Sequence, residues 1–150
     1  MLCVAVFLAV PGLRIGEILS LGESNVDRKS RFIIPNCHSG ETKHSGISFY
    51  NEEAEALLEQ FEKSKNIWQR KSHRLFSMGR DKFFYSWKRA KEKSGINMRP
   101  KDLRDFFSQE MGKALIPDRY INIFEGRAPK NVLAKHHNPH GIKMLRRDLR

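Results

Sequence analysis

The chain has too few cysteines, and too short an apolar run, for several large classes of protein. Its 150 residues include two cysteines, Cys3 and Cys37, too few for the disulfide framework of a secreted domain. The longest apolar stretch, residues 1–10, is far shorter than the ~20 residues that cross a bilayer. It also lacks the basic leader and cleavage site of a signal peptide. We therefore predict a cytoplasmic chain with reduced thiols and no membrane partner.

The sequence has no internal repeat, no low-complexity segment and no convincing set of metal ligands. His136, His137 and His140 are candidates for a metal site. Adjacent residues on a helix, however, point about 100° apart, and no acidic residue stands beside these histidines to complete a ligand set. His38 beside Cys37 is equally weak as a site. We expect no metal, no cofactor and no small-molecule ligand.

Acidic residues are scarce in the second part of the chain. Residues 1–60 carry 5 basic and 8 acidic side chains, whereas residues 61–150 carry 23 and 9, and the formal net charge is +11. Such an uneven distribution of charge is typical of a protein that binds a polyanion, because each neutralised phosphate releases counterions. The alternative is a basic, solvated surface of a thermophilic or ribosome-associated protein. We favour a nucleic acid as the partner.

Length and hydrophobic periodicity predict a single, mostly α-helical domain with one small antiparallel β-sheet. Two helices hinged at residues 11–12 occupy residues 1–21, and the sheet lies within residues 25–50, with strands at 32–34 and within 42–50. The later helices begin near residues 51, 81, 99, 117 and 128, and a basic tail helix ends at Arg150. A chain that opens on a buried helix indicates that residues 1–150 form an N-terminally truncated domain.

Each predicted helix has an apolar face that we expect to point inward. The first helix is apolar on all sides, so we expect it to be buried. The residues expected to face the core are Leu2, Val6 and Leu8; Ile15, Ile18, Leu19 and Leu21; Ala54, Leu57, Leu58 and Phe61; Phe83, Phe84, Trp87 and Ala90; Leu103, Phe106, Phe107 and Met111; and Tyr120, Ile121 and Phe124.

Two arginines occupy positions that the helical pattern does not require. Arg14 opens a predicted helix directly after a Pro-Gly turn, and Arg104 shares a helix face with Lys101. Cations near a helix N-terminus oppose the macrodipole unless an anion is bound there. For either arginine alone, a surface salt bridge is the simpler interpretation. Together, their positions indicate a phosphate site.

The spacing of these residues resembles the phage-integrase family of tyrosine recombinases. Residues 12–21, GLRIGEILSL, resemble its first arginine box. Residues 99–104, RPKDLR, resemble the second box, with Lys101 in place of the usual histidine. Lys43 lies in the predicted sheet, where the family keeps a mobile catalytic lysine.

A further match precedes the last predicted helices. Arg127 follows Gly126 where the family has Gly-His. The replacement of both histidines by basic residues, and the run GRAPKNVLAK over residues 126–135, are most similar to archaeal fusellovirus-type integrases. Such integrases belong to archaeal viruses and proviruses.

The resemblance implies DNA strand exchange through a tyrosine that attacks a phosphate and forms a 3′-phosphotyrosyl link, without metal or ATP. Arg14 and Arg104 would clamp the non-bridging oxygens with planar, permanently charged forks. Lys43 would protonate the leaving 5′-oxygen, and Lys101 and Arg127 would add hydrogen bonds and charge. The implied partner is double-stranded DNA, together with further copies of the chain that assemble on it through the tail helix.

The nucleophile position departs from the family pattern. The tyrosine should lie nine or ten residues after Arg127, where the sequence has His136 and His137, and the family context points to His137. All tyrosines of the chain precede Arg127: Tyr50, Tyr85 and Tyr120. Because losing the nucleophile removes the covalent route, we expect an inactive recombinase catalytic domain.

Two alternatives to this interpretation remain open. A histidine at the nucleophile position could form a phosphoramidate or activate a water as a slow nuclease. The chain could also be a non-catalytic basic DNA-binding module, left from a split or decayed integrase gene.

Overall fold

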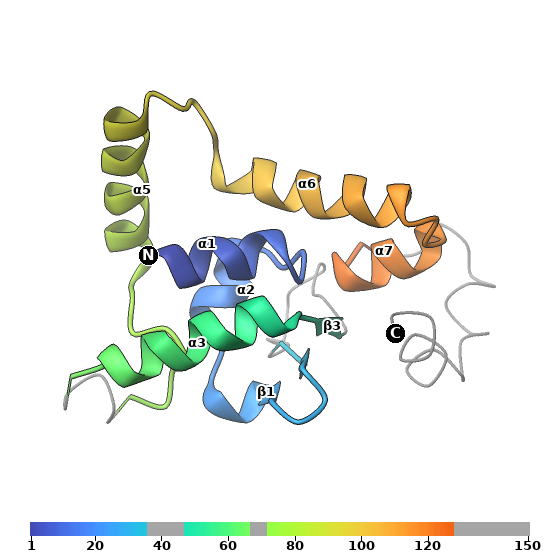
Figure 1. The fold of residues 1–150 in the computed structure, drawn as a ribbon, viewed down its shortest axis with the longest axis horizontal. Coiled ribbons are helices and arrows are strands. Elements are labelled where there is room, and N and C mark those ends of the chain that lie inside the picture. The colour runs from blue at the N-terminus through green and yellow to red at the C-terminus, as the bar shows by residue number, and fades with distance from the viewer. Residues whose placement is uncertain (36–46, 67–71, 128–150) are drawn as a thin grey trace.

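The computed structural model describes residues 1–35, 47–66 and 72–127. Over these ranges the chain is mostly helical with a three-stranded antiparallel sheet (Figure 1), which confirms the predicted fold class. The elements are α1 (Leu2–Ala9), α2 (Ile15–Ser20), the 3-10 helix η1 (Glu23–Asn25), β1 (Val26–Asp27), β2 (Phe32–Ile33), β3 (Ser48–Phe49), α3 (Glu52–Ser64), α5 (Arg80–Ser94), α6 (Pro100–Lys113) and α7 (Asp118–Phe124).

Helix α1 lies at the centre of this arrangement. It packs against α6 on one side and against α3 and α2 on the other. Helix α5 stands across one end of the molecule, and α7 lies beneath the far end of α6 (Figure 1), with which it is in contact. The turn between α1 and α2 lies against α6 at Phe107.

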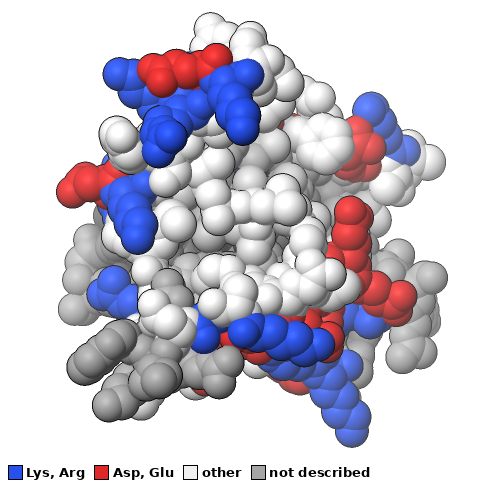
Figure 2. Space-filling view, turned by 60° about the vertical axis from the view of Figure 1, so that its left-hand side comes forward, with Lys and Arg blue, Asp and Glu red and all other residues white. Residues whose placement is uncertain are grey.

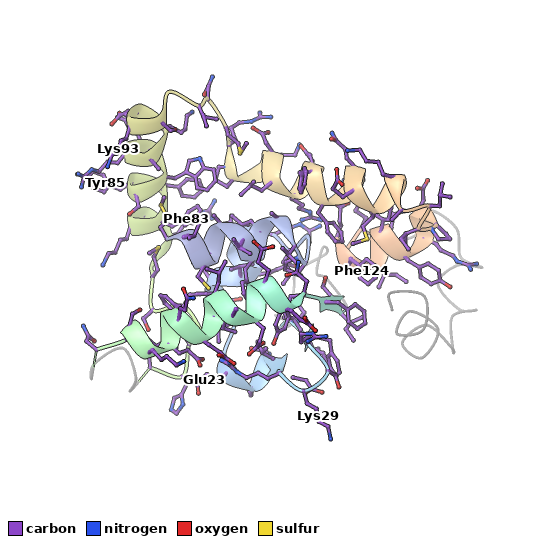
Figure 3. The ribbon with its side chains drawn as sticks, viewed as in Figure 1. Glu23, Lys29, Phe83, Tyr85, Lys93 and Phe124 are labelled. Carbon is purple, nitrogen blue, oxygen red and sulfur yellow. The ribbon has the colours of Figure 1, made fainter. Side chains whose placement is uncertain are left out.

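The core consists of two clusters of buried side chains. In the larger cluster, the ring of Phe7 on α1 lies 5.4 Å from the rings of both Tyr50 and Phe76. The smaller cluster joins α6 to α7, as the labelled Phe124 illustrates (Figure 3). Its buried members are Phe107, Tyr120, Ile121 and Phe124, which confirms the packing predicted for α7.

The sheet contacts the turn before α2 through its last strand, β3. Val26 pairs with Ile33, and Phe32 pairs with Phe49, both in antiparallel register. The buried hydroxyl of Ser48 on β3 donates a hydrogen bond to the carbonyl of Pro11. Strand positions were predicted correctly at 32–33 and 48–49. Residues 42–46 lie outside the described residues, as do the helices predicted to begin at residue 128 and to end at Arg150.

Three residues expected in the core are largely exposed. Leu2 is 67% exposed, Phe84 40% and Phe106 50%. The prediction was wrong because neighbouring residues on a helix point about 100° apart. Phe83 is buried beside the exposed Phe84, and Phe107 beside the exposed Phe106. Leu2 lies in the first turn of α1, whose buried residues begin at position 3.

The described cysteine is a buried, free thiol. Burial raises the pKa of Cys3 to about 11, so the thiol stays protonated and unreactive near neutral pH. Cys37 lies outside the described residues. Within the described ranges, no helix has both the length and the apolar character needed to span a membrane.

Helix α6 ends in a Schellman motif with an unfavourable residue. Leu115 and Ile116 donate backbone hydrogen bonds of 3.0 Å to the carbonyls of Gly112 and Met111, and Leu115 has φ of 58°. Because Leu115 is 88% exposed, its side chain contributes little packing. A left-handed L-residue costs about 1–2 kcal/mol, and glycine loses about 0.5–1 kcal/mol more backbone entropy on folding.

We therefore expect Leu115→Gly to raise the free energy of unfolding by about 0.5–1 kcal/mol. Urea denaturation followed by circular dichroism measures the change. Leu115→Ala is the matched control, since it removes the exposed side chain but keeps the Cβ strain, and it should leave stability nearly unchanged. A glycine variant no more stable than the alanine variant would refute the assignment of strain.

Candidate functional site

Arg14 lies at the start of α2, where both its backbone N–H and its side chain contact Glu17. The chain reaches it through a turn in which Gly12 has φ of 66°. Arg14 is the N-cap residue of α2. Its N–H donates to Glu17 Oε2 at 2.7 Å, and its Nη1 lies 3.3 Å from Glu17 Oε1. The predicted helix over residues 13–21 is thus shorter, and Arg14 precedes its first turn.

The start of α6 has the same capping arrangement as the start of α2. Arg99 is its N-cap residue, and the N–H of Arg99 donates to Asp102 Oδ2 at 2.8 Å. Lys101 and Arg104 follow on successive turns. Both helix starts thus carry an acid three residues after the N-cap, Glu17 and Asp102. These acids offset the cations, so the electrostatic imbalance at the two helix starts is smaller than the spacing of the cations alone predicts.

The segment after α7 meets both helix starts. Gly126 has φ of 60°, which turns the chain directly after α7. The Nη2 of Arg14 donates to the Gly126 carbonyl at 3.1 Å. The Nη2 of Arg104 donates to the Glu125 carbonyl. Three segments that are remote in sequence therefore converge at one place.

The carboxylate of Glu125 lies inside this junction with no exposed surface. Its Oε1 accepts a hydrogen bond from Ser108 Oγ at 2.7 Å and another from Arg104 Nε at 3.3 Å. Its Oε2 lies 2.7 Å from Arg127 Nε in an ion pair. A buried carboxylate of this kind needs cationic partners to offset its desolvation.

A large pocket opens beside the junction. Its volume is about 1290 Å³, and Arg14, Lys101, Arg104 and Arg127 all line it. Its apolar lining residues are Leu8, Leu13, Ile15, Phe84, Trp87, Met98 and Pro100. Figure 2 shows a broad area of uncharged residues that is bordered by Lys and Arg side chains and also by Asp and Glu side chains. The pocket therefore combines concentrated positive charge with an apolar wall.

Arg104 is the most deeply buried of these cations, with 12% of its side chain exposed. Burial lowers the pKa of Arg104, Glu125 opposes that shift, and the nearby charge of Arg14 adds to it. The guanidinium remains protonated at neutral pH because its ordinary pKa is very high. A buried, permanent charge next to a second arginine favours a bound anion such as a phosphate.

The structure brings together four of the six residues predicted for the site. Arg14, Lys101, Arg104 and Arg127 share the pocket. Lys43 and His137 lie outside the described residues.

All three tyrosines of the chain lie within the described residues, and none of them lines the pocket. Tyr50 and Tyr120 are buried in the core. Tyr85 is 64% exposed on the outer side of α5 (Figure 3).

Sequence reasoning missed the acidic partners of the arginines. Glu17 could have been found from its spacing, because an acid three residues after an N-cap residue is a recognised capping pattern. Glu125 and Ser108 gave no local signal. The one available hint was that Glu125, a charged residue, directly follows the apolar run of α7. Only the tertiary fold reveals that Glu125 is buried.

Comparison with known proteins agrees with this architecture. Residues 1–132 match the Phage integrase family. Tyrosine recombinase XerA of Saccharolobus solfataricus is 32% identical over 98 residues, 65% of this chain and 31% of that protein. The crystal structure of XerA recombinase has a TM-score of 0.68 at 20% identity, over 99% of this chain and 57% of the other.

A second solved structure has the same fold. The Tn1549 transposon integrase in complex with circular intermediate DNA has a TM-score of 0.67 at 17% identity, over 99% of this chain and 56% of the other. The chain thus spans under a third of the archaeal relative and little more than half of the two solved chains. The predicted closeness to fusellovirus-type integrases stays a prediction. Since the family match extends over most of its length, the chain belongs to the phage integrase family.

Proposed function

We propose that this chain is a tyrosine-recombinase catalytic domain that binds duplex DNA at the pocket but does not cleave it. The observation that carries the proposal is the convergence of Arg14, Lys101, Arg104 and Arg127 on one pocket. These cations come from three segments that are far apart in the sequence. A backbone phosphate is the anion that such a cluster fits best in a chain with a net charge of +11.

The roles of the cations follow from their chemistry. Arg14 and Arg104 present planar guanidinium groups that match the two non-bridging oxygens of a phosphodiester. Their positive charge suits the pentacoordinate state, in which negative charge on those oxygens increases. Lys101 and Arg127 supply further charge at the rim. We propose that Lys43 would protonate the leaving 5′-oxygen once a nucleophile is present.

We expect no cleavage because the chain lacks the tyrosine that would act as the nucleophile. Strand transfer requires an oxygen that attacks phosphorus while the bond to the 5′-oxygen breaks, and no tyrosine of this chain lines the pocket. The position that matches the family tyrosine is His137. The names of the relatives support the DNA partner, since one is a recombinase and another was solved with circular intermediate DNA. Assembly of several copies through the tail helix stays a prediction.

The test is binding and cleavage of nicked duplexes by the unaltered chain. Fluorescence anisotropy should show binding that weakens as salt rises, with a log–log slope of about −3 to −4 if four cations contact phosphates. Lys101→Ala should reduce that slope by about one. A denaturing gel should show no covalent adduct. The proposal fails if the chain does not bind duplex DNA, and an adduct from the unaltered chain would show that another residue is the nucleophile.

A further inference from the structure

We propose that Glu125 is the positioning residue of the phosphate pocket. This inference rests on the proposed function and deepens it. Glu125 does not line the pocket. Its fully buried carboxylate contacts two of the cations that do, Arg104 and Arg127. Its role is to fix the direction in which these guanidinium groups present their remaining donors.

The geometry at Arg104 is the first step. A guanidinium group is planar, so fixing two of its nitrogens fixes the whole group. The Nε of Arg104 donates to the carboxylate of Glu125, and the Nη2 donates to the main-chain carbonyl of the same residue. Both contacts lie on one edge of the group. With respect to the described residues, Nη1 and the second N–H of Nη2 therefore remain for an anion in the pocket.

The second step concerns the two oxygens of the carboxylate. Oε1 accepts hydrogen bonds from Ser108 and Arg104, while Oε2 is paired with Arg127 at 2.7 Å. Oε2 is buried and accepts no hydrogen bond from any described residue. Its one close partner there is the charge of Arg127, whose side chain is 56% exposed. Glu125 thus pairs with a half-exposed arginine that lines the pocket.

A carboxylate is the group that can hold both arginines at once. A glutamine at position 125 has one oxygen and one NH2 group. If its oxygen keeps Ser108 and Arg104, its NH2 group lies beside the positive charge of Arg127, and an amide NH2 group cannot pair with that charge. Glu125→Gln must therefore release one arginine, although it has almost the same shape as the original side chain.

The direction in which Glu125→Gln changes DNA affinity therefore tests the proposal. Glu125→Gln raises the net charge by one, so electrostatics alone predicts tighter DNA binding. If Glu125 positions the arginines, binding per folded molecule should instead weaken about five- to tenfold, as expected when the charged partner of one arginine is lost. Anisotropy with a labelled duplex at fixed salt measures the affinity, and circular dichroism measures the folded fraction.

Glu92→Gln is the matched control. Glu92, unlike Glu125, lines the pocket, and it is exposed and paired with Lys88. Its replacement makes the same change of charge without touching the buried arginines, so binding should tighten slightly. Glu125→Asp, which keeps the charge, should recover part of the affinity lost in Glu125→Gln.

A spectroscopic readout separates positioning from simple stabilisation. The ¹⁵N signal of Arg104 Nε, assigned by its loss in Arg104→Lys, should shift in Glu125→Gln. If that variant does not fold, Ser108→Ala removes one hydrogen bond to the same carboxylate and should give a smaller shift and a smaller loss of affinity. Unchanged affinity and signal in a folded variant would overturn the inference. Failure of the unaltered chain to bind DNA would instead overturn the proposed function.

Discussion

His137→Tyr is expected to yield a covalent protein–DNA adduct on nicked suicide duplexes on which the unaltered chain yields none. The cations proposed to stabilise the pentacoordinate phosphate converge on one pocket, so the component that we propose to be missing is the attacking oxygen. Restoring it should change the yield from undetectable to readily visible, because the covalent route exists only with a nucleophile. A pool of duplexes with randomised sequence around the nick removes the need to know the target site. Denaturing gel electrophoresis separates the adduct.

His136→Tyr is the matched control for this experiment. It places the same side chain one residue before the position that matches the family tyrosine, and should give no adduct. Arg104→Ala in the His137→Tyr background should abolish the reaction, because it removes the buried guanidinium. If neither tyrosine variant reacts while both bind DNA, the chain is a non-catalytic DNA-binding module.

Gly12→Ala is expected to lower the free energy of unfolding by about 2–5 kcal/mol. A Cβ at this position would lie 2.2 Å from Cδ1 of Phe107, and Gly12 has φ of 66°. The left-handed backbone costs about 1–2 kcal/mol for an L-residue, and the overpacking costs about 1–3 kcal/mol. Urea denaturation measures the loss. DNA affinity should also fall, because the displaced turn carries Arg14.

Gly112→Ala tests the same substitution on the helix that carries Phe107. No atom lies within 4 Å of the Cβ that this change adds, so the variant should gain about 0.5–1 kcal/mol from the helical preference of alanine. A Gly12→Ala variant as stable as the unaltered chain would show that the turn and α6 can separate without cost.

Much of the helical framework could be predicted from the sequence, because its signals are local. Asn51 before three early acids marks the start of α3, and the structure shows Asn51 Oδ1 accepting the N–H of Ala54. Pro100 is a second local signal, because proline is favoured at the first position of a helix, and it begins α6. The errors came where periodicity was ambiguous, since Phe83 and Phe84 are adjacent and only one of them can face the core.

The candidate site was predictable on its basic side only. Arg14 and Arg104 stand in recognisable boxes, so the resemblance located them without a structure. Glu125 lies in no such pattern. Its importance arises from contacts with Arg104 and Ser108, which are 21 and 17 residues away, and no local rule encodes contacts at that separation.

The hydrogen bond between Arg14 and Gly126 joins residues 112 positions apart in the chain. Closing so long a loop carries a large entropic cost, and contacts of this range slow folding. During synthesis on the ribosome, α1 and α2 emerge long before α7, so a partly made chain has the first arginine without its partners. The proposed affinity of this pocket for DNA is therefore complete only after the segment that follows α7 has docked on Arg14.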